Sequence, residues 1–256
     1  MSLQAASLRF AYPRGDELLG GVDLTLEPGR FTCLLGANGC GKSTLLRLLA
    51  GMLTPAAGTV RLDDARLDDM ALAARARRIG FLPQEVHPSF SYRVEESVAL
   101  GVHVAGHGNW LGDGPDADAA VRRALDAVDA APLHGRLLQE LSGGERRRVL
   151  IAGVLAQEPD YLLLDEPAAM LDLHHQAALF RMLRSLAADG LGVLCVTHDW
   201  NLAARHADEL VLLAGGRVAA RGAARDVLRR EVLEQVFGTD FELLERDSGP
   251  PVVLPA

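Results

Sequence analysis

A single lysine stands among the 26 lysines and arginines of this chain, at position 42. It lies in the run Gly-Ala-Asn-Gly-Cys-Gly-Lys-Ser-Thr, residues 36–44, which has the G-x-x-x-x-G-K-[ST] spacing of a phosphate-binding loop. A lysine ammonium is a compact charge that can point into a group of phosphate oxygens, whereas arginine is a planar fork. Backbone N–H groups of such a loop and the N-terminus of the following helix also bind the anion. The run therefore predicts a nucleoside triphosphate site.

The side chains of this loop are expected to have separate roles. Lys42 should reach the β- and γ-phosphates, and the Ser43 hydroxyl should ligate Mg²⁺. We interpret Cys40 as a small residue that the loop tolerates. The candidate nucleotide-binding residues of the loop are Asn38, Gly39, Cys40, Gly41, Lys42, Ser43 and Thr44.

Two adjacent acids follow a strand-like run. Residues 161–164 are Tyr-Leu-Leu-Leu, and Asp165 and Glu166 come next. On a buried strand beside the phosphate loop, Asp165 is expected to hold Mg²⁺, directly or through a water, and Glu166 to polarise the attacking water. The alternative is a strand that ends in a solvated acidic turn, and the presence of the phosphate loop weighs against it.

A third run, Leu-Ser-Gly-Gly-Glu at residues 141–145, opens an expected helix. A Ser142 hydroxyl, the unobstructed N–H groups of Gly143 and Gly144 and a positive helix end would suit a γ-phosphate. Ser142 and Glu145 also have the spacing of a capping box, which would only close the helix end. The two interpretations are compatible, since a cap in one state can be a phosphate contact in another.

Together these runs resemble the ATP-binding-cassette (ABC) ATPases, whose signature sequence is close to L-S-G-G-Q. Glu145 is a departure at the last signature position. The resemblance implies that Gln84 bridges the Mg²⁺ site to a helical subdomain and that His198 contacts the γ-phosphate. It also implies that Asp172 lies on a loop that crosses between two subunits. Tyr12 could stack on adenine, and its alternative is an ordinary aromatic at a strand end.

Several elements must hold these residues in place. Residues 8–12 and 22–26 alternate apolar and polar side chains, which predicts antiparallel strands. Residues 31–35 are mostly apolar and predict a buried strand that leads into the phosphate loop, followed by a helix over 43–50. Residues 59–62 predict a further strand in the N-terminal sheet.

The rest of the chain divides into a helical stretch and an alternating one. Helices are expected over residues 94–100, 117–130 and 144–157. Strands are then expected over 161–164, 193–197, 210–214 and 217–220, with helices over 173–188 and 200–206. Alternating strands and helices are typical of a parallel sheet with helical crossovers.

The predicted fold class is therefore α/β. We expect a P-loop NTPase core of RecA-like type with a mostly parallel sheet, an N-terminal antiparallel β-subdomain and an inserted α-helical subdomain over approximately residues 88–157. Residues 1–246 would form a single ABC ATPase domain. Residues 247–256 are rich in proline and apolar residues and are predicted to be a loose tail.

Composition excludes some partners. The net charge of −8 argues against a broad basic surface for nucleic acid, so no nucleic-acid partner is expected. The arginines at 146–148 are interpreted as a solvated helix face. The apolar runs around residues 162 and 194 have strand length, well short of the roughly 20 residues that a membrane helix needs.

The resemblance also implies an activity and partners. It implies an ATPase with ATP and Mg²⁺, which works as a head-to-tail homodimer in which Ser142, Gly143 and Gly144 of one subunit close over ATP on Lys42 of the other. Residues 94–101, 171–176 and 197–204 look like those of ATPase subunits of siderophore, haem and cobalamin importers. Such a subunit binds integral-membrane permease subunits at the cytoplasmic face of the inner membrane, and through them serves a periplasmic or extracellular substrate-binding protein.

Two alternatives remain open at this point. A soluble, non-transport ABC ATPase of the iron–sulfur assembly or repair type would keep the same chemistry. A small-molecule or nucleotide kinase would share the phosphate loop but would leave residues 142–144 unexplained.

Overall fold

The computed structural model describes residues 1–86, 91–106, 115–246 and 249–255. Two main sheets organise the chain: a four-stranded antiparallel sheet with the order β2-β1-β4-β5 and a six-stranded sheet with the order β10-β9-β3-β8-β7-β6. In the larger sheet β9, β3, β8, β7 and β6 are parallel, and only β10 runs antiparallel to its neighbour. The predicted α/β fold with an N-terminal antiparallel subdomain is confirmed.

The strands are β1 Leu3–Ala11, β2 Glu17–Leu26, β3 Phe31–Gly36, β4 Ala57–Leu62, β5 Ala65–Arg66, β6 Ile79–Leu82, β7 Tyr161–Asp165, β8 Gly192–Val196, β9 Glu209–Ala214, β10 Arg217–Gly222, β11 Phe241–Leu244 and β12 Val252–Pro255. The α-helices are α1 Lys42–Leu49, α2 Leu72–Arg78, α3 Val94–Ala105, α4 Pro115–Asp126, α5 Gly143–Leu155, α6 Leu173–Ala188, α7 Trp200–His206, α8 Ala224–Val227 and α9 Arg230–Phe237. Short 3₁₀ helices cover Leu67–Asp69, Ala131–Leu133 and Leu138–Glu140.

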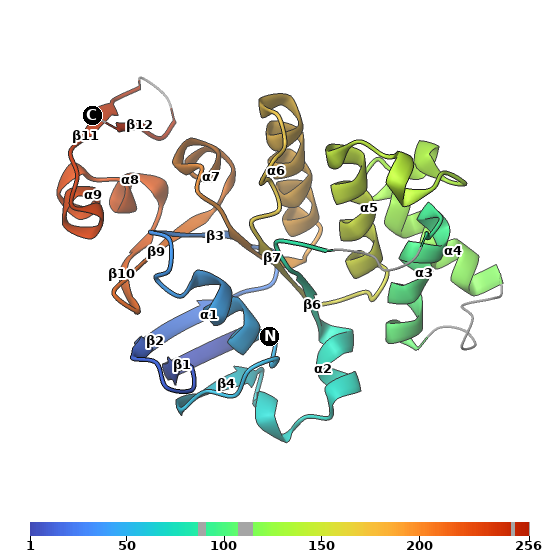
Figure 1. Cartoon of the computed structure of the whole chain (residues 1–256), viewed down its shortest axis with the longest axis horizontal. Helices are drawn as coiled ribbons and strands as arrows, with labels where there is room; N and C mark the ends of the chain where they lie inside the picture. Colours follow the sequence, from blue (N-terminus) through green and yellow to red (C-terminus); the bar gives the residue numbers. More distant parts are fainter. Residues whose placement is uncertain (87–90, 107–114, 247–248, 256) are drawn as a thin grey trace.

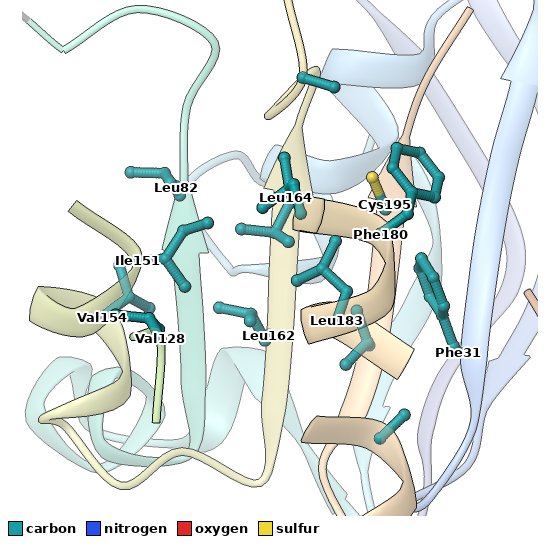
Figure 2. Close-up of a cluster of buried hydrophobic side chains, with 14 of the residues drawn as sticks. Phe31, Leu82, Val128, Ile151, Val154, Leu162, Leu164, Phe180, Leu183 and Cys195 are labelled. Carbon is teal, nitrogen blue, oxygen red and sulfur yellow. The ribbon is translucent and has the colours of Figure 1, made fainter. Parts of the chain in front are cut away.

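Two hydrophobic clusters cover the two faces of the larger sheet. Strand β7 shows the division, because successive side chains of a strand point to opposite faces. Leu162 and Leu164 belong to the cluster with α5 and α6, whereas Leu163 belongs to the cluster with α1 and the antiparallel sheet. Figure 2 shows the first cluster, in which the ring centroids of Phe31 and Phe180 are 5.9 Å apart. A strand buried on both faces explains why β7 is a continuous apolar run in the sequence.

The helices of the stretch between β6 and β7 lie beyond the β6 end of the larger sheet, as Figure 1 shows. Helices α3 and α5 pack through Gly101, where a Cβ would lie 1.9 Å from the Gly153 carbonyl oxygen, so only glycine permits this approach. Helix α4 ends at Asp126, earlier than residue 130 as predicted from the sequence. The reason is a turn in which Asp129 has a left-handed φ of 53°.

The prediction of a loose C-terminal tail is wrong for residues 252–255. Strand β12 pairs antiparallel with β11, and Val253 is buried. The side chain of Asn201 on α7 accepts a hydrogen bond from the Val253 N–H at 2.9 Å and donates one to the Val253 carbonyl at 3.2 Å. The apolar residues of this segment thus have a surface to cover. Residues 247, 248 and 256 of the predicted tail lie outside the described residues.

Across the described parts of the chain, no helix combines the length and the apolar character needed to cross a membrane.

Candidate nucleotide-binding site

The phosphate loop leaves the carboxyl end of β3 and enters α1, which is the context that its sequence predicts. Gly41 precedes the helix with a φ of 106°, a conformation that glycine adopts readily and other residues rarely do. A Cβ at this position would also lie 2.6 Å from a methyl group of Leu19. The glycine therefore allows both the turn and the close approach of β2 to the loop.

Lys42 is 6% exposed, and its ammonium is enclosed by the backbone of the phosphate loop. Its Nζ atom donates hydrogen bonds to the carbonyl oxygens of Gly36 and Ala37, each at 2.9 Å. A cavity of about 580 Å³ opens beside it, large enough for polar ligand atoms. The residues that line it are Leu18, Asn38, Gly39, Gly41, Lys42, Ser43, Thr44, Gln84, Glu166 and His198. Side chains predicted from four separate sequence runs thus meet in one cavity.

Ser43 and Asp165 form the oxygen-rich part of the site. The Ser43 hydroxyl donates to Asp165 Oδ1 at 3.0 Å, and Asp165 is 2% exposed. Burial raises the pKa of the Asp165 carboxyl, although the hydrogen bond from Ser43 partly opposes this effect. A hydroxyl and a carboxylate are ligands that suit Mg²⁺, an ion that usually keeps waters and substrate phosphates as its other ligands. The donor set therefore fits the predicted magnesium site.

Glu166 lies at the centre of the catalytic candidates. Its Oε1 is 2.6 Å from Nε2 of His198, and its Oε2 accepts a hydrogen bond from Nε2 of Gln84 at 2.9 Å. Gln84 follows β6, Glu166 follows β7 and His198 follows β8, three neighbouring strands whose carboxyl ends meet at one edge of the sheet. The φ of Glu166 is 46°, which is uncommon for a residue with a side chain and is typical of strained functional positions. The carboxylate is thus held from both sides.

Tyr12 lies beside the phosphate loop, one residue after β1 ends. Its hydroxyl is 3.1 Å from Oγ1 of Thr44, and the Phe10 ring packs edge-on against it with centroids 4.9 Å apart. The side chain keeps substantial exposure to solvent, at 41% for the residue. The contacts fix the position of the ring and leave surface for a base, so stacking on adenine stays a prediction.

In the described part of the chain, Gly143 of the 141–145 run lines a neighbouring pocket with Gln84 and Glu166, and not the phosphate cavity. Ser142 caps helix α5, with its Oγ accepting from the Glu145 N–H at 3.3 Å, while the Glu145 carboxylate accepts from the Ser142 N–H at 2.8 Å. These backbone and hydroxyl hydrogen bonds lower the pKa of the Glu145 carboxyl. The predicted capping box is confirmed. Within the described residues, the lining of the phosphate cavity includes none of Ser142, Gly143, Gly144 and Glu145.

Asp172 is exposed and caps helix α6. Its Oδ1 accepts from the N–H of His175 at 2.9 Å and lies 2.8 Å from the ring Nδ1 of the same histidine. The hydrogen bond from the backbone N–H is the main reason why the pKa of the Asp172 carboxyl is lowered. The ring of His175 in turn packs on Gly144, where a Cβ would lie 2.7 Å from its Cδ2. The two exposed motifs therefore touch each other through one histidine.

The interpretation of residues 146–148 as a solvated helix face is wrong for Arg147, which is 9% exposed. The helical spacing contains the signal, because Gly144, Arg147, Ile151 and Val154 recur every three or four residues and are all buried. Burial lowers the pKa of the Arg147 guanidinium to about 10. By composition alone an arginine triplet is typical of one exposed face, and only the helical spacing distinguishes Arg147 from its neighbours.

Comparison with known proteins supports the same assignment. The family model described as "ABC transporter" matches residues 19–169. The hemin import ATP-binding protein HmuV of Rhizobium meliloti (strain 1021) is 44% identical over 232 residues, which cover 88% of this chain and 87% of that protein.

Solved structures agree with the sequence comparisons. A structure described as an inward-facing metal-chelate type ABC transporter is 29% identical and has a TM-score of 0.85, covering all of this chain and 97% of that one. The dimeric structure of MJ0796, a bacterial ABC transporter cassette, is 26% identical with a TM-score of 0.75, covering 86% of this chain and 98% of that one. The resemblance predicted from the phosphate loop, the acidic pair and residues 141–145 is confirmed, and this chain belongs to the ABC transporter family as one of its ATP-binding subunits.

Proposed function

We propose that this chain hydrolyses ATP at the phosphate cavity and that two copies do so together to drive import of a metal chelate through a separate permease. The observation that carries the proposal is the Glu166 carboxylate, held between Gln84 and His198 in the cavity that also contains Lys42. A carboxylate fixed in this way can accept a proton from a water that attacks the γ-phosphate.

Five side chains in and beside the cavity have separate parts in this chemistry. The Lys42 ammonium, now bound to two carbonyl oxygens, would offer its charge to the phosphates. Ser43 and Asp165 would hold Mg²⁺, which when bound neutralises charge on the phosphate oxygens. His198, 2.6 Å from the Glu166 carboxylate, orients that group and also lines the cavity, where it would contact the γ-phosphate. Tyr12 would place the base.

The proposed homodimer is supported by the position of the 141–145 run, which is outside the described lining of the phosphate cavity. Ser142 and Gly143, which are exposed, and Gly144, which is buried, lie at the start of α5 and outside the described lining of the cavity. Such a helix end binds anions when one is brought to it. A second copy related by two-fold symmetry would supply it, and the related MJ0796 cassette is described as dimeric.

A mixing experiment tests the shared site. Lys42→Ala and Ser142→Ala are each expected to be inactive as homodimers. In a mixed dimer one site combines both changes and the other combines neither. Random pairing of equal amounts should then restore about a quarter of the wild-type rate. If the mixture stays as inactive as its components, the two motifs do not work across subunits.

The choice of import and of cargo class rests on similarity. The relative at 44% identity is named for hemin import, and the structure at 29% identity is described as metal-chelate type. We therefore place the chain at the cytoplasmic face of the inner membrane, bound to integral-membrane permease subunits that receive cargo from a substrate-binding protein. Haem is the first cargo to test, with siderophores and cobalamin as the next.

Purification of the affinity-tagged chain from membranes of its source tests the coupling. A polytopic permease in the eluate is expected, and ATPase activity of the reconstituted complex should rise with haem-loaded binding protein. Recovery of a soluble scaffold instead of a permease would favour the soluble ABC ATPase of assembly or repair type. Transfer of phosphate to an acceptor other than water would favour a kinase.

A further inference from the structure

Arg147 of helix α5 reaches from the helical stretch into the core of the ATPase site. Its Nη1 donates to the backbone carbonyls of Pro83 and Gln84, each at 3.3 Å, and its Nη2 donates to the carbonyl of Asp165 at 3.2 Å. The side chain is 9% exposed, so these contacts are largely protected from water. One guanidinium thus joins a helix that begins at Gly143 to two other segments of the chain.

One of those segments contains Gln84, which donates to the catalytic carboxylate, and the other leads directly into Glu166, which bears that carboxylate. Pro83 and Gln84 directly follow β6, and Asp165 is the last residue of β7. The strands are parallel neighbours, with Leu82 paired to Leu164, so the three carbonyls lie at adjacent strand ends. A planar fork with several N–H donors matches such a pair of strand ends better than a single ammonium would.

Burial of the Arg147 guanidinium lowers the free energy of unfolding in comparison with a well-packed apolar side chain. Among the ion pairs found in the described residues, none involves Arg147, and its Nε has no hydrogen-bond partner there. A buried charge without a carboxylate partner is unfavourable unless its hydrogen bonds compensate. Positions that break a local rule in this way are often functional.

We propose that Arg147 is a positioning residue, through which the helix that begins at Gly143 controls the placement of Gln84 and Glu166. The proposal rests on the proposed role of Glu166 in ATP hydrolysis. Movement of α5 shifts the Gln84 backbone and the end of β7 together, because one side chain holds both. The carboxylate stays aligned only while the guanidinium is in place.

The neighbouring arginines provide the comparison. Arg148 donates to the carbonyl of Asp129, away from both strand ends, and serves as the matched control. Arg147→Met removes the three hydrogen bonds and keeps much of the side-chain length. Arg147→Lys keeps the charge but offers a single nitrogen, which cannot reproduce the fork.

The variants are assayed as the full chain for kcat, for KM of ATP and for thermal unfolding. Misplacement of a catalytic group by a small distance can cost a rate factor of about 100, so Arg147→Met should lower kcat by roughly 10- to 100-fold. KM should change by less than about threefold, since the Lys42 loop is untouched. Arg147→Lys should fall between, and Arg148→Met should stay within about twofold of wild type.

A double-mutant cycle with Gln84→Ala separates positioning from packing. If Arg147 acts through the Gln84 segment, the double variant loses less activity than the product of the two single losses. Losses of activity that multiply in the double variant would overturn the proposal. A normal kcat in Arg147→Met with only a lower melting temperature would also overturn it. Should Arg147→Met not fold, the same cycle with Arg147→Lys decides. If these tests reject the role of Arg147 but ATP hydrolysis still depends on Glu166, the proposed function is unaffected.

Discussion

The two motif-bearing regions of this molecule differ in how their polar groups are satisfied. At the phosphate site, Lys42 and Asp165 are buried, and their partners come from the same chain. Around the start of α5 and α6, Ser142 and Asp172 are exposed, and within the described part of the chain their hydrogen bonds go to their own helix ends. Nearby, Met170 is 99% exposed.

The difference indicates which half of the chemistry one protomer completes alone. A buried charge must find its partners inside the fold, so the cavity is assembled as soon as the chain folds. An exposed helix end with small residues stays ready for a group from elsewhere. Exposed apolar side chains such as Met170 and Leu173 next to such an end are typical of a surface that another subunit covers.

The largest expected effect is at the phosphate site, which one protomer assembles alone. Glu166→Gln keeps the shape and removes the proton acceptor, so kcat should fall by about 10²- to 10⁴-fold while ATP still binds. Turnover, ATP binding and size-exclusion chromatography with ATP measure this, and the variant should accumulate as a dimer. Glu231→Gln, on the exposed start of α9, is the control. A monomeric, fully active Glu166→Gln protein contradicts the assignment.

The packing at the start of α5 and α6 can be disrupted by steric crowding. Gly144→Ala places a methyl group 2.7 Å from the His175 ring, which Asp172 holds, and overpacking of this kind costs about 1–3 kcal/mol of unfolding free energy. Gly143→Ala meets its first neighbour, Leu171, only at 3.9 Å and should cost less. Adding His175→Ala to Gly144→Ala should recover most of the loss. Equal melting temperatures for the two glycine variants would contradict this packing.

The C-terminal strand gives a smaller effect outside both regions. Asn201→Ala removes two hydrogen bonds to Val253, and a typical bond contributes about 1 kcal/mol net, so the free energy of unfolding should fall by about 1–2 kcal/mol. Chemical denaturation measures the difference, and faster cleavage of the C-terminus by carboxypeptidase reports the released strand. Asn38 is unsuitable as a control because it lines the cavity, whereas Gln235→Ala at an exposed position of α9 is suitable. Unchanged stability would leave the tail loose after all.

The smallest effect separates the two regions by the sign of their pH dependence. Burial raises the pKa of Asp165 above its unfolded value of about 3.9, so its stabilising contribution is present below that pH and is lost as the pH rises through the folded pKa. Backbone hydrogen bonding lowers the pKa of Glu145, so its contribution is present above the unfolded pKa and is lost as the pH falls.

Unfolding free energies of Asp165→Asn and Glu145→Gln at about pH 4 and pH 7 check this difference. Relative to wild type, Asp165→Asn should gain stability between the lower and the higher pH, and Glu145→Gln should lose it. The same sign for both variants would show that the two regions do not differ in this way.

Residues with a local pattern were predictable, and residues defined by distant neighbours were less so. The phosphate loop, the acidic pair and the capping box each have a spacing that local chemistry imposes, and each has the predicted context. Helices α6 and α7 have the predicted bounds because their caps, Asp172 and Asp199, stand directly before them. Strand β12 was not predicted, because residues 252–255 gain a surface to cover only where the fold brings them against β11 and Asn201 of α7.

Arg147 shows the same limit in a single side chain. An arginine within an arginine triplet is expected to be exposed to solvent. Arg147 is buried because its position on the helix turns it inward and the carbonyls at the ends of β6 and β7 accept its hydrogen bonds. Burial of a charge depends on partners that the fold brings from other segments, here residues 83, 84 and 165.

The sequence by itself determined the chemistry: a loop for phosphate with the only lysine of the chain, acids for a metal ion and a water, and a helix end suited to an anion. Only the tertiary structure decided which of these groups meet in one protomer. Parallel strands bring their carboxyl ends to one edge of the sheet, and this places Gln84, Glu166 and His198 within hydrogen-bonding distance. The start of α5, a helix that packs with α3 and α4, is not part of the described lining of the phosphate cavity.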